Sequence, residues 1–351
     1  MRGGATGRRT FLAGVGAAAC GLAGCSARLE AGGETTPVSL LLNWQPGGLH
    51  VPYYAAESEG FYGDEGIEIA EIEAGQGSDF SATQVGLDNV EFAITSSDQI
   101  LNAAAEELAS TCVAVVMQRG PVQVFATPEQ FGEELTDADQ LAGRTLGSGP
   151  GMVRQMTESY LEVEGVREEV EYVDSGMDTV QQLLTGEIDA AGGVFSDVVD
   201  ARHQDYEIDA LSVADVIPSY GHVIAVGDEI REEDPETVER FLRATARGAV
   251  WANENPEEAT DALADAVEEL AETWENQRDK WEEMRTGFML SSTVEEQGWG
   301  ASEPEPWESV HETLAGGEFE EGDVDPDDVW TNEYLDTDSE YVAEYAERVE
   351  T

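Results

Sequence analysis

The residues best suited to bind a small molecule lie together between Leu41 and Ile69, in the sequence LLNWQPGGLHVPYYAAESEGFYGDEGIEI. A buried strand is expected to end near Leu42, after which a proline and two glycines interrupt regular structure. Trp44 and His50 therefore lie in or beside an irregular loop. A helix follows, and the free N–H groups at a helix start favour a polar ligand. This composition is typical of a ligand-binding loop.

A flat heteroaromatic ligand requires aromatic faces and a few fixed polar groups. We expect Trp44, with Tyr53 or Tyr54, to supply the faces. Because micromolar affinity needs about 8 kcal/mol and one aromatic pair adds roughly 0.5 to 1.5 kcal/mol, stacking alone is insufficient. Polar partners are expected at the ends of predicted strands, where open α/β sheets bind ligands. These candidates are Asn43, Gln76, Ser97, Ser148 and Tyr220. We also expect ligand contacts from His50, Ser96 and Gly149.

Each of these candidates also has a purely structural alternative. Trp44 is a core residue in that alternative, and His50 bonds to the backbone of its own loop. Ser148 caps a helix that starts at Pro150, a role compatible with ligand contact. The serines at 96 and 97 have the same ambiguity.

The charge of the chain restricts its partners and its environment. Of 351 residues, 75 are acidic and 17 are basic, which gives a net charge of −58. This balance disfavours nucleic acid and anionic membrane surfaces as partners. Ionic strength near 1 M shortens the Debye length to about 3 Å and relieves the self-repulsion, so we interpret the chain as halophilic. Periodic hydrophobic segments disfavour a disordered acidic protein, and the absence of a D-x-D-x-D-G loop disfavours a calcium store.

The first residues have the pattern of an export signal. Arg8 and Arg9 precede a small-residue apolar run that ends at Cys25, as in a twin-arginine signal with a lipoprotein cleavage box. An ordinary secretory signal is the alternative. We expect residues 1–24 to be removed, Cys25 to be lipidated at the outer face of the cytoplasmic membrane, and residues 25–37 to act as a tether. Cys112 would remain as the only free thiol, without disulfide or metal-type cysteine spacing.

Short apolar runs alternate with helical patterns along the rest of the chain, which predicts α/β units. Two segments, 121–127 and 222–227, are expected to pair as crossover strands. Helix starts are expected at Pro235 and Pro256. The acidic run 268–283 is expected to be only a solvated helix face. The expected strands are 38–42, 67–72, 92–95, 113–117, 144–147, 170–173 and 190–194, and the expected helices in the middle of the chain are 150–163 and 178–184.

The stretch from Leu41 resembles the periplasmic-binding-protein families that bind or make the thiamine pyrimidine, whose members read L-N-W-x-P…H…G-[FY]-[FY]…E-G-[IL]. Similar landmarks extend over most of residues 38–336. The residues that match the motif keep its spacing without a gap, and they are Asn43, Trp44, Pro46, His50, Gly60, Phe61, Glu65 and Gly66. The resemblance implies an α/β, two-lobed type 2 fold with the ligand in a cleft between lobes. Lobe 1 would comprise 38–125 and 226–351, and lobe 2 would comprise 126–225.

The resemblance also places Met177 and Tyr220 in the cleft.

Two departures from the family pattern restrict which family function this chain can have. Synthesising members consume the histidine equivalent to His50 and carry a cysteine-rich motif, whereas residues 217–222 contain no cysteine. Some pyrimidine-binding members have a glutamate where this chain has Val194 and Phe195. The sequence also lacks the common motifs of hydrolases, zinc enzymes and phosphate-binding enzymes. We therefore expect no enzyme, no cofactor and no metal.

The expected function is that of a solute-binding lipoprotein. It would be a monomer that delivers a thiamine-precursor-like pyrimidine or related nitrogen heterocycle to an ABC permease and its ATPase. The alternative ligand is a sulfonate, nitrate or similar anion. Such an anion would lie on glycine-rich loops and helix starts, with Arg154 nearby.

Unfolding followed by circular dichroism across a potassium chloride series tests the halophilic interpretation. Because salt screens repulsion between carboxylates, stability should rise strongly with salt. A fold that is equally stable below about 0.1 M salt would contradict the interpretation.

Overall fold

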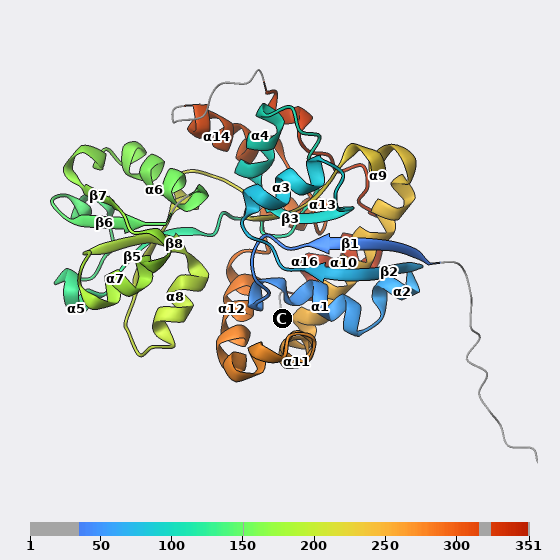
Figure 1. Cartoon of the computed structure of the whole chain (residues 1–351), viewed down its shortest axis with the longest axis horizontal. Coiled ribbons are helices and arrows are strands. Elements are labelled where there is room, and N and C mark those ends of the chain that lie inside the picture. The colour runs from blue at the N-terminus through green and yellow to red at the C-terminus, as the bar shows by residue number, and fades with distance from the viewer. Residues whose placement is uncertain (1–34, 150, 316–323, 350–351) are drawn as a thin grey trace, which may run out of the picture. The chain divides into compact units, whose positions relative to one another are not determined.

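The computed structural model describes residues 35–149, 151–315 and 324–349, except for the side chain of Met177. These residues form two five-stranded sheets (Figure 1). The twin-arginine segment, Cys25 and most of the expected tether lie outside the described residues. No described helix is both long and apolar enough to cross a membrane.

The first sheet has the strand order β2-β1-β3-β10-β4. Its strands β1 and β2 are parallel, β1 and β3 are parallel, and β10 is antiparallel to both β3 and β4. The carboxyl ends of β1 and β3 therefore lie beside the amino end of β10. The strands are β1 (Thr36–Leu41), β2 (Ile67–Glu73), β3 (Phe92–Ser96), β4 (Thr111–Val115) and β10 (His222–Val226).

The second sheet has the order β7-β6-β8-β5-β9. Here β6 is parallel to β7 and β8, whereas β5 is antiparallel to β8 and β9. Both sheets thus contain one strand that runs against its neighbours. The strands are β5 (Val122–Ala126), β6 (Thr145–Ser148), β7 (Glu171–Asp174), β8 (Ala190–Val194) and β9 (Asp209–Ser212).

Helices flank both sheets (Figure 1). The helix starts expected at Pro235 and Pro256 are confirmed, and the Asp234 carboxylate accepts from the N–H of Thr237 at the first of them. The helices are α1 (Val51–Ser58), α2 (Phe61–Asp64), α3 (Ser78–Gly86), α4 (Ser97–Ala105), α5 (Pro128–Phe131), α6 (Met152–Val163), α7 (Thr179–Thr185), α8 (Phe195–Arg202), α9 (Asp228–Glu233), α10 (Pro235–Glu254), α11 (Pro256–Ala266), α12 (Trp274–Gly287), α13 (Ser292–Gln297), α14 (Pro304–Ala315), α15 (Glu340–Ala343) and α16 (Tyr345–Val349).

The expected pairing of two crossover strands is wrong, because β5 and β10 belong to different sheets. Each forms its ladder within its own sheet, so the chain passes between sheets in the segments 116–121 and 213–221. The expected lobe limits at 125/126 and 225/226 fall inside these strands. Hydrophobic pattern alone does not specify which sheet a short apolar strand joins.

An aromatic stack links the two sheets beside the first connection. Phe195, which follows β8, lies in the core cluster of the first sheet and stacks on Phe288 with ring centroids 4.3 Å apart. The N–H of Phe195 donates to Pro121 O at 3.0 Å, and the N–H of Gln118 donates to Phe288 O at 2.7 Å. The stack therefore holds both ends of the connecting segment.

Helices α8 and α12 provide polar contacts between the same parts of the fold. Lys280, the only lysine in the sequence, places Nζ 2.8 Å from Asp200 Oδ1. Asn276 Nδ2 donates to that carboxylate at 2.8 Å, and His203 Nε2 lies 2.9 Å from Asp279 Oδ2. The expectation that residues 268–283 are only a solvated helix face is therefore wrong. One side of α12 is buried at Trp281, and the helix also contacts α8.

Replacing Phe195 with alanine should cost about 3–5 kcal/mol of unfolding free energy and loosen the connection between the sheets. Phe131→Ala is the matched control, because Phe131 is equally buried but packs within the core of the second sheet. Urea unfolding should show a similar loss for both variants. Only Phe195→Ala should increase the radius of gyration in small-angle scattering, and an unchanged radius would contradict the linking role of the stack.

Candidate ligand-binding site

Polar side chains converge where β1 and β3 end and β10 begins. Ser96, at the end of β3, is directly opposite His222 in the antiparallel ladder. Alternation along β10 places His222 on the same face as Ile224 and Val226, which pack with the start of α1. His50 immediately precedes α1 on this face. The topology thus brings together three polar residues from distant parts of the sequence.

The two histidines form a buried pair. Their ring centroids are 5.4 Å apart and their planes differ by 16°. His50 is 3% exposed and His222 is 4% exposed. His50 Nε2 lies 2.9 Å from Asn43 Oδ1, whereas the buried Nδ1 atoms of both rings have no hydrogen-bond partner among the described residues. The ring of His222 therefore retains a free hydrogen-bonding group, whereas the ring of His50 also lies beside the Gly47 carbonyl.

Burial keeps both rings neutral. Loss of hydration lowers the pKa of His222 to about 4. The pKa of His50 is also held well below its ordinary value, first by burial and then by the proximity of His222. Burial likewise raises the pKa of the nearby Asp98 carboxyl, which accepts from Gln99 Nε2. The edge of the first sheet consequently disfavours charged side chains.

The loop after β1 is fixed at its backbone and open at Trp44. The N–H of Gly75 donates to Trp44 O at 3.0 Å, and the N–H of Gly48 donates to Gln277 Oε1 of α12 at 2.9 Å. Gly75 must remain a glycine, because a Cβ there would lie 1.9 Å from Leu42 O. The Trp44 side chain is 46% exposed, which excludes the alternative of a core tryptophan.

Four expected residues do not present the groups assigned to them. Tyr53 and Tyr54 are buried in the core cluster beneath α1, so the expectation that one of them supplies an open aromatic face is wrong. Ser97 Oγ donates to Tyr220 O at 3.0 Å and accepts from its N–H at 3.2 Å. The N–H of Glu303 in turn donates to Tyr220 Oη at 3.0 Å. Ser97 and Tyr220 therefore hold the second connection instead of presenting free polar groups.

The remaining candidates lie on separate loops. Gln76 is exposed beside the Trp44 loop. Ser148, at the end of β6, is buried and its hydroxyl contacts Tyr172 Oη and Gly149 O. It does not cap α6, whose N-cap is Gly151. Gly149 follows it, and the side chain of Met177 lies outside the described part of the structure.

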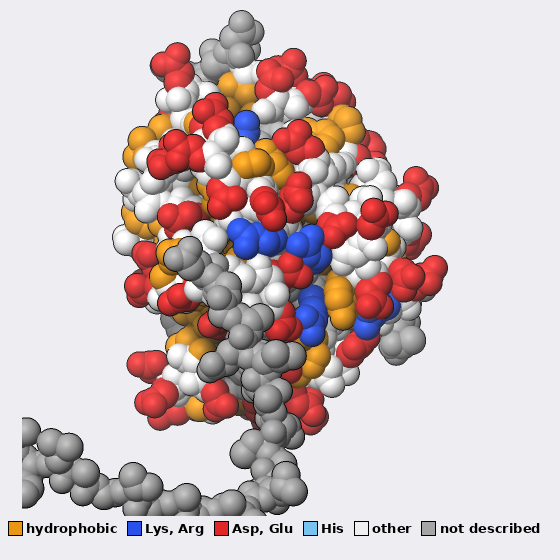
Figure 2. Space-filling view, turned by 90° about the vertical axis from the view of Figure 1, so that its right-hand side faces the viewer, with side chains coloured by type: hydrophobic (Ala, Val, Ile, Leu, Met, Phe, Trp, Pro, Cys, Tyr) orange, Lys and Arg blue, Asp and Glu red, His pale blue; other side chains and the backbone are white. Residues whose placement is uncertain are grey.

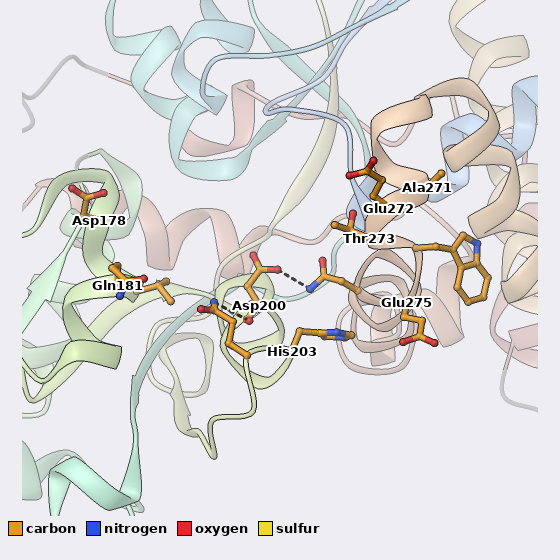
Figure 3. A pocket seen from close by; sticks show the side chains of 12 residues that line it. Asp178, Gln181, Asp200, His203, Ala271, Glu272, Thr273 and Glu275 are labelled. Carbon is orange, nitrogen blue, oxygen red and sulfur yellow. Dashed lines mark hydrogen bonds between the residues drawn. The ribbon is translucent and has the colours of Figure 1, made fainter.

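A separate cavity of about 690 Å³ lies between α7, α8 and the segment that leads into α12 (Figure 3). Asp178 and Gln181 line one side, and Glu272, Thr273 and Glu275 line the other. Trp274 also lines it, with Nε1 donating to Asp261 Oδ1 at 2.8 Å. This acidic cavity is a second place where a ligand can be sought, distinct from the edge of the first sheet.

Basic side chains near these loops are already paired. Arg119, in the first connection, pairs with Asp215, and Arg154 of α6 places Nη1 3.3 Å from Asp174 Oδ2. The described residues contain no group of three His, Cys, Asp or Glu side chains suited to a metal ion. His222 is the site residue that sequence reasoning missed. Its signal is the antiparallel register with Ser96, which the sequence does not display.

Comparison with known proteins shows which family the sequence matches. Residues 48–259 match the family described as NMT1/THI5 like. The riboflavin-binding protein RibY of Chloroflexus aurantiacus is 26% identical over 305 residues, which cover 85% of this chain and 86% of RibY. The formylaminopyrimidine-binding protein of Halalkalibacterium halodurans is 24% identical over 324 residues, which cover 89% of this chain and 94% of that protein.

Enzymes are also among the relatives. A 4-amino-5-hydroxymethyl-2-methylpyrimidine phosphate synthase of Legionella pneumophila is 27% identical over 237 residues, which cover 65% of this chain and 73% of the synthase. The periplasmic nitrate-binding protein NrtA of Synechocystis PCC 6803 superposes with a TM-score of 0.64 at 12% identity, over 88% of this chain and 91% of NrtA. That likeness confirms the two-lobed type 2 fold. The family match covers more than half of the sequence, and the chain therefore belongs to the NMT1/THI5-like family.

Proposed function

We propose that the protein is an extracytoplasmic solute-binding protein of an ABC importer, and that its ligand is a thiamine-precursor-like pyrimidine or a related nitrogen heterocycle. The observation that carries this proposal is the uncharged polar edge formed by Asn43, His50 and His222 beside an open tryptophan. Trp44 offers an aromatic face, and the amide and imidazole groups offer directional hydrogen bonds.

The same edge is less suited to a small anion. A sulfonate or nitrate carries a full charge, which requires cationic partners or several aligned N–H donors in a buried site. The two histidines resist protonation, and Arg119, Arg154 and the Lys280 that packs against the Trp44 loop are each paired with a carboxylate. A neutral heterocycle avoids this electrostatic cost, so we favour it over the anion.

The names of the relatives support a heterocyclic ligand. RibY is named as a riboflavin-binding protein and another relative as a formylaminopyrimidine-binding protein. Relatives named as synthases keep an enzymatic alternative open. Against that alternative, residues 217–222 of this chain contain no cysteine, and the export signal favours transport.

The proposal also covers the membrane anchor, the transporter partners and the salt environment of the protein. Cleavage before Cys25 and acylation of that residue would anchor the chain outside the cytoplasmic membrane, with a permease and an ATPase as partners. The acidic composition suits a monomer that works in molar salt. Mass spectrometry of the membrane-extracted protein tests the anchor, since an unmodified Cys25 would exclude it.

Calorimetry in molar potassium chloride should detect tight binding of one ligand among hydroxymethylpyrimidine, formylaminopyrimidine, thiamine and riboflavin, and no binding of taurine or nitrate. Trp44→Ala should weaken that binding about tenfold or more, because it removes the stacking face. Trp274→Ala is the matched control, since Trp274 lines the separate acidic cavity.

The outcomes of this experiment separate the alternatives. Loss of binding only in Trp274→Ala would move the ligand to the acidic cavity. Tight binding of taurine or nitrate that Trp44→Ala leaves unchanged would contradict the heterocycle. Chemical turnover of any bound ligand would establish an enzyme.

The neutral histidines predict a pH dependence of stability. Between pH 6.5 and about 4 the unfolded state binds more protons than the folded state, so the histidines contribute stability above pH 6.5 that is lost as pH falls. For His222 alone the loss by pH 4 is about 3 kcal/mol. Urea unfolding in molar salt at several pH values measures it.

His222→Phe is the control for this pH dependence. Burial raises the pKa values of Asp98 and Asp197, so protonation of these carboxyls stabilises the folded protein as pH falls. This contribution has the opposite sign to that of the histidines. That opposing contribution is common to both proteins, and the difference between them therefore reports His222 together with its electrostatic effect on His50. Equal pH dependence of the two proteins would show that His222 is not buried in its neutral form.

A further inference from the structure

We propose that His222 contacts the ligand directly and, together with His50, selects a ligand that offers both a hydrogen-bond donor and an acceptor in the plane of its ring. This inference rests on the proposed function and extends it to one specificity-determining residue. Neither the loop motif after β1 nor the family landmarks in the sequence include His222.

His222 lies at the edge of the first sheet that the Trp44 loop also borders. It is the first residue of β10, at the edge where β1 and β3 end, and it lies opposite Ser96 in the ladder. Open sheets of this kind bind ligands at that edge. Its ring stacks on His50, which contacts Asn43 at the start of the Trp44 loop. His222 therefore lies in the same polar group as the loop that is proposed to bind the ligand.

The nitrogen atoms of the two rings are only partly used within the protein. A neutral imidazole carries one N–H donor and one lone-pair acceptor. His50 uses Nε2 toward Asn43, but the Nδ1 atoms of His50 and His222 are buried without a partner among the described residues. Buried polar atoms in folded proteins are normally paired with protein, water or ligand. The free Nδ1 of His222 gains its meaning from its place, on a ring stacked against His50 and opposite Ser96 at the edge where a ligand is proposed to bind.

The chemistry of the rings then restricts the ligand. Because burial disfavours the imidazolium form, the pair cannot act as two cationic donors toward an anion. It offers donor and acceptor groups instead, beside an Asn43 amide whose Oδ1 faces His50 Nε2 and whose Nδ2 donates to Ser78 Oγ at 3.5 Å. A ring nitrogen next to an exocyclic amine, carbonyl or hydroxymethyl group presents the complementary pattern. A tetrahedral or planar oxyanion presents acceptors only.

Nitrogen NMR of histidine-labelled protein tests the proposal without altering the fold. The sequence contains four histidines, at positions 50, 203, 222 and 311, so the spectrum contains four imidazoles. Saturation with the heterocycle that binds best in calorimetry should shift the Nδ1 resonances of His50 and His222. His203 contacts Asp279 on α12, and its resonances together with those of His311 serve as internal references.

Binding measurements on variants provide the second readout. His222→Phe keeps a flat ring against His50 but removes both nitrogen atoms, and it should weaken the heterocycle about 10- to 100-fold, the cost of losing a buried hydrogen bond. His311→Phe is the matched control on α14 and should bind as the parent does. Circular dichroism in molar salt verifies that both variants are folded.

The possible results decide the proposal and the function separately. If the heterocycle binds the parent protein but neither shifts His222 nor loses affinity in His222→Phe, the role of His222 is overturned while the proposed function stands. Buried water would then be the partner of Nδ1. If only taurine or nitrate binds, the proposed function fails and this inference fails with it. Coincident shifts at His50 and His222 with weaker binding in the variant support it.

Discussion

The insertion of β10 between β3 and β4 is the interaction on which the structure depends. After all five strands of the second sheet, the chain returns to the first sheet and runs antiparallel to its neighbours. This pairing fixes the second connection close to the first, because β4 leads out of the sheet and β10 leads back beside it. It also places His222 where β1 and β3 end. The polar edge and the link between the sheets are thus products of one strand pairing.

Burial, and not the acidic composition, keeps the groups at that edge neutral. Among 75 acidic residues the few basic side chains serve as partners, as Arg243 does for Glu65 at 2.7 Å and Asp336 at 2.9 Å. A strongly negative surface favours histidine protonation, yet burial dominates and keeps His222 neutral. High salt screens surface carboxylates but leaves this desolvation unchanged. The composition that makes the surface extreme therefore does not make the buried edge charged.

The sequence predicted local elements better than their assembly. Alternation of apolar runs and helical patterns predicted β1, β2, β3 and β8 within a residue or two, and the Asp234–Pro235 signal located the start of α10. Short acidic β9 lacked an apolar pattern and was missed. The site was predicted in part: Trp44 is open and His50 meets Asn43, but α1 turns Tyr53 and Tyr54 into the core. Strand register across distant segments, which places His222, has no local signature.

Helix α12 contacts both the Trp44 loop and helix α8, which follows β8 of the second sheet. Gln277 accepts from the N–H of Gly48 in the Trp44 loop, and Lys280, one helical turn further on, pairs with Asp200 of α8. The loop fits closely, since a Cβ at Gly48 would lie 2.2 Å from Gln277 O. A change in the separation of α8 from the first sheet therefore either breaks the polar contacts with α12 or displaces that helix. Because the loop rests on α12, displacement of the helix also moves Trp44, so a change in the separation of the two sheets would be coupled to the position of the proposed stacking face.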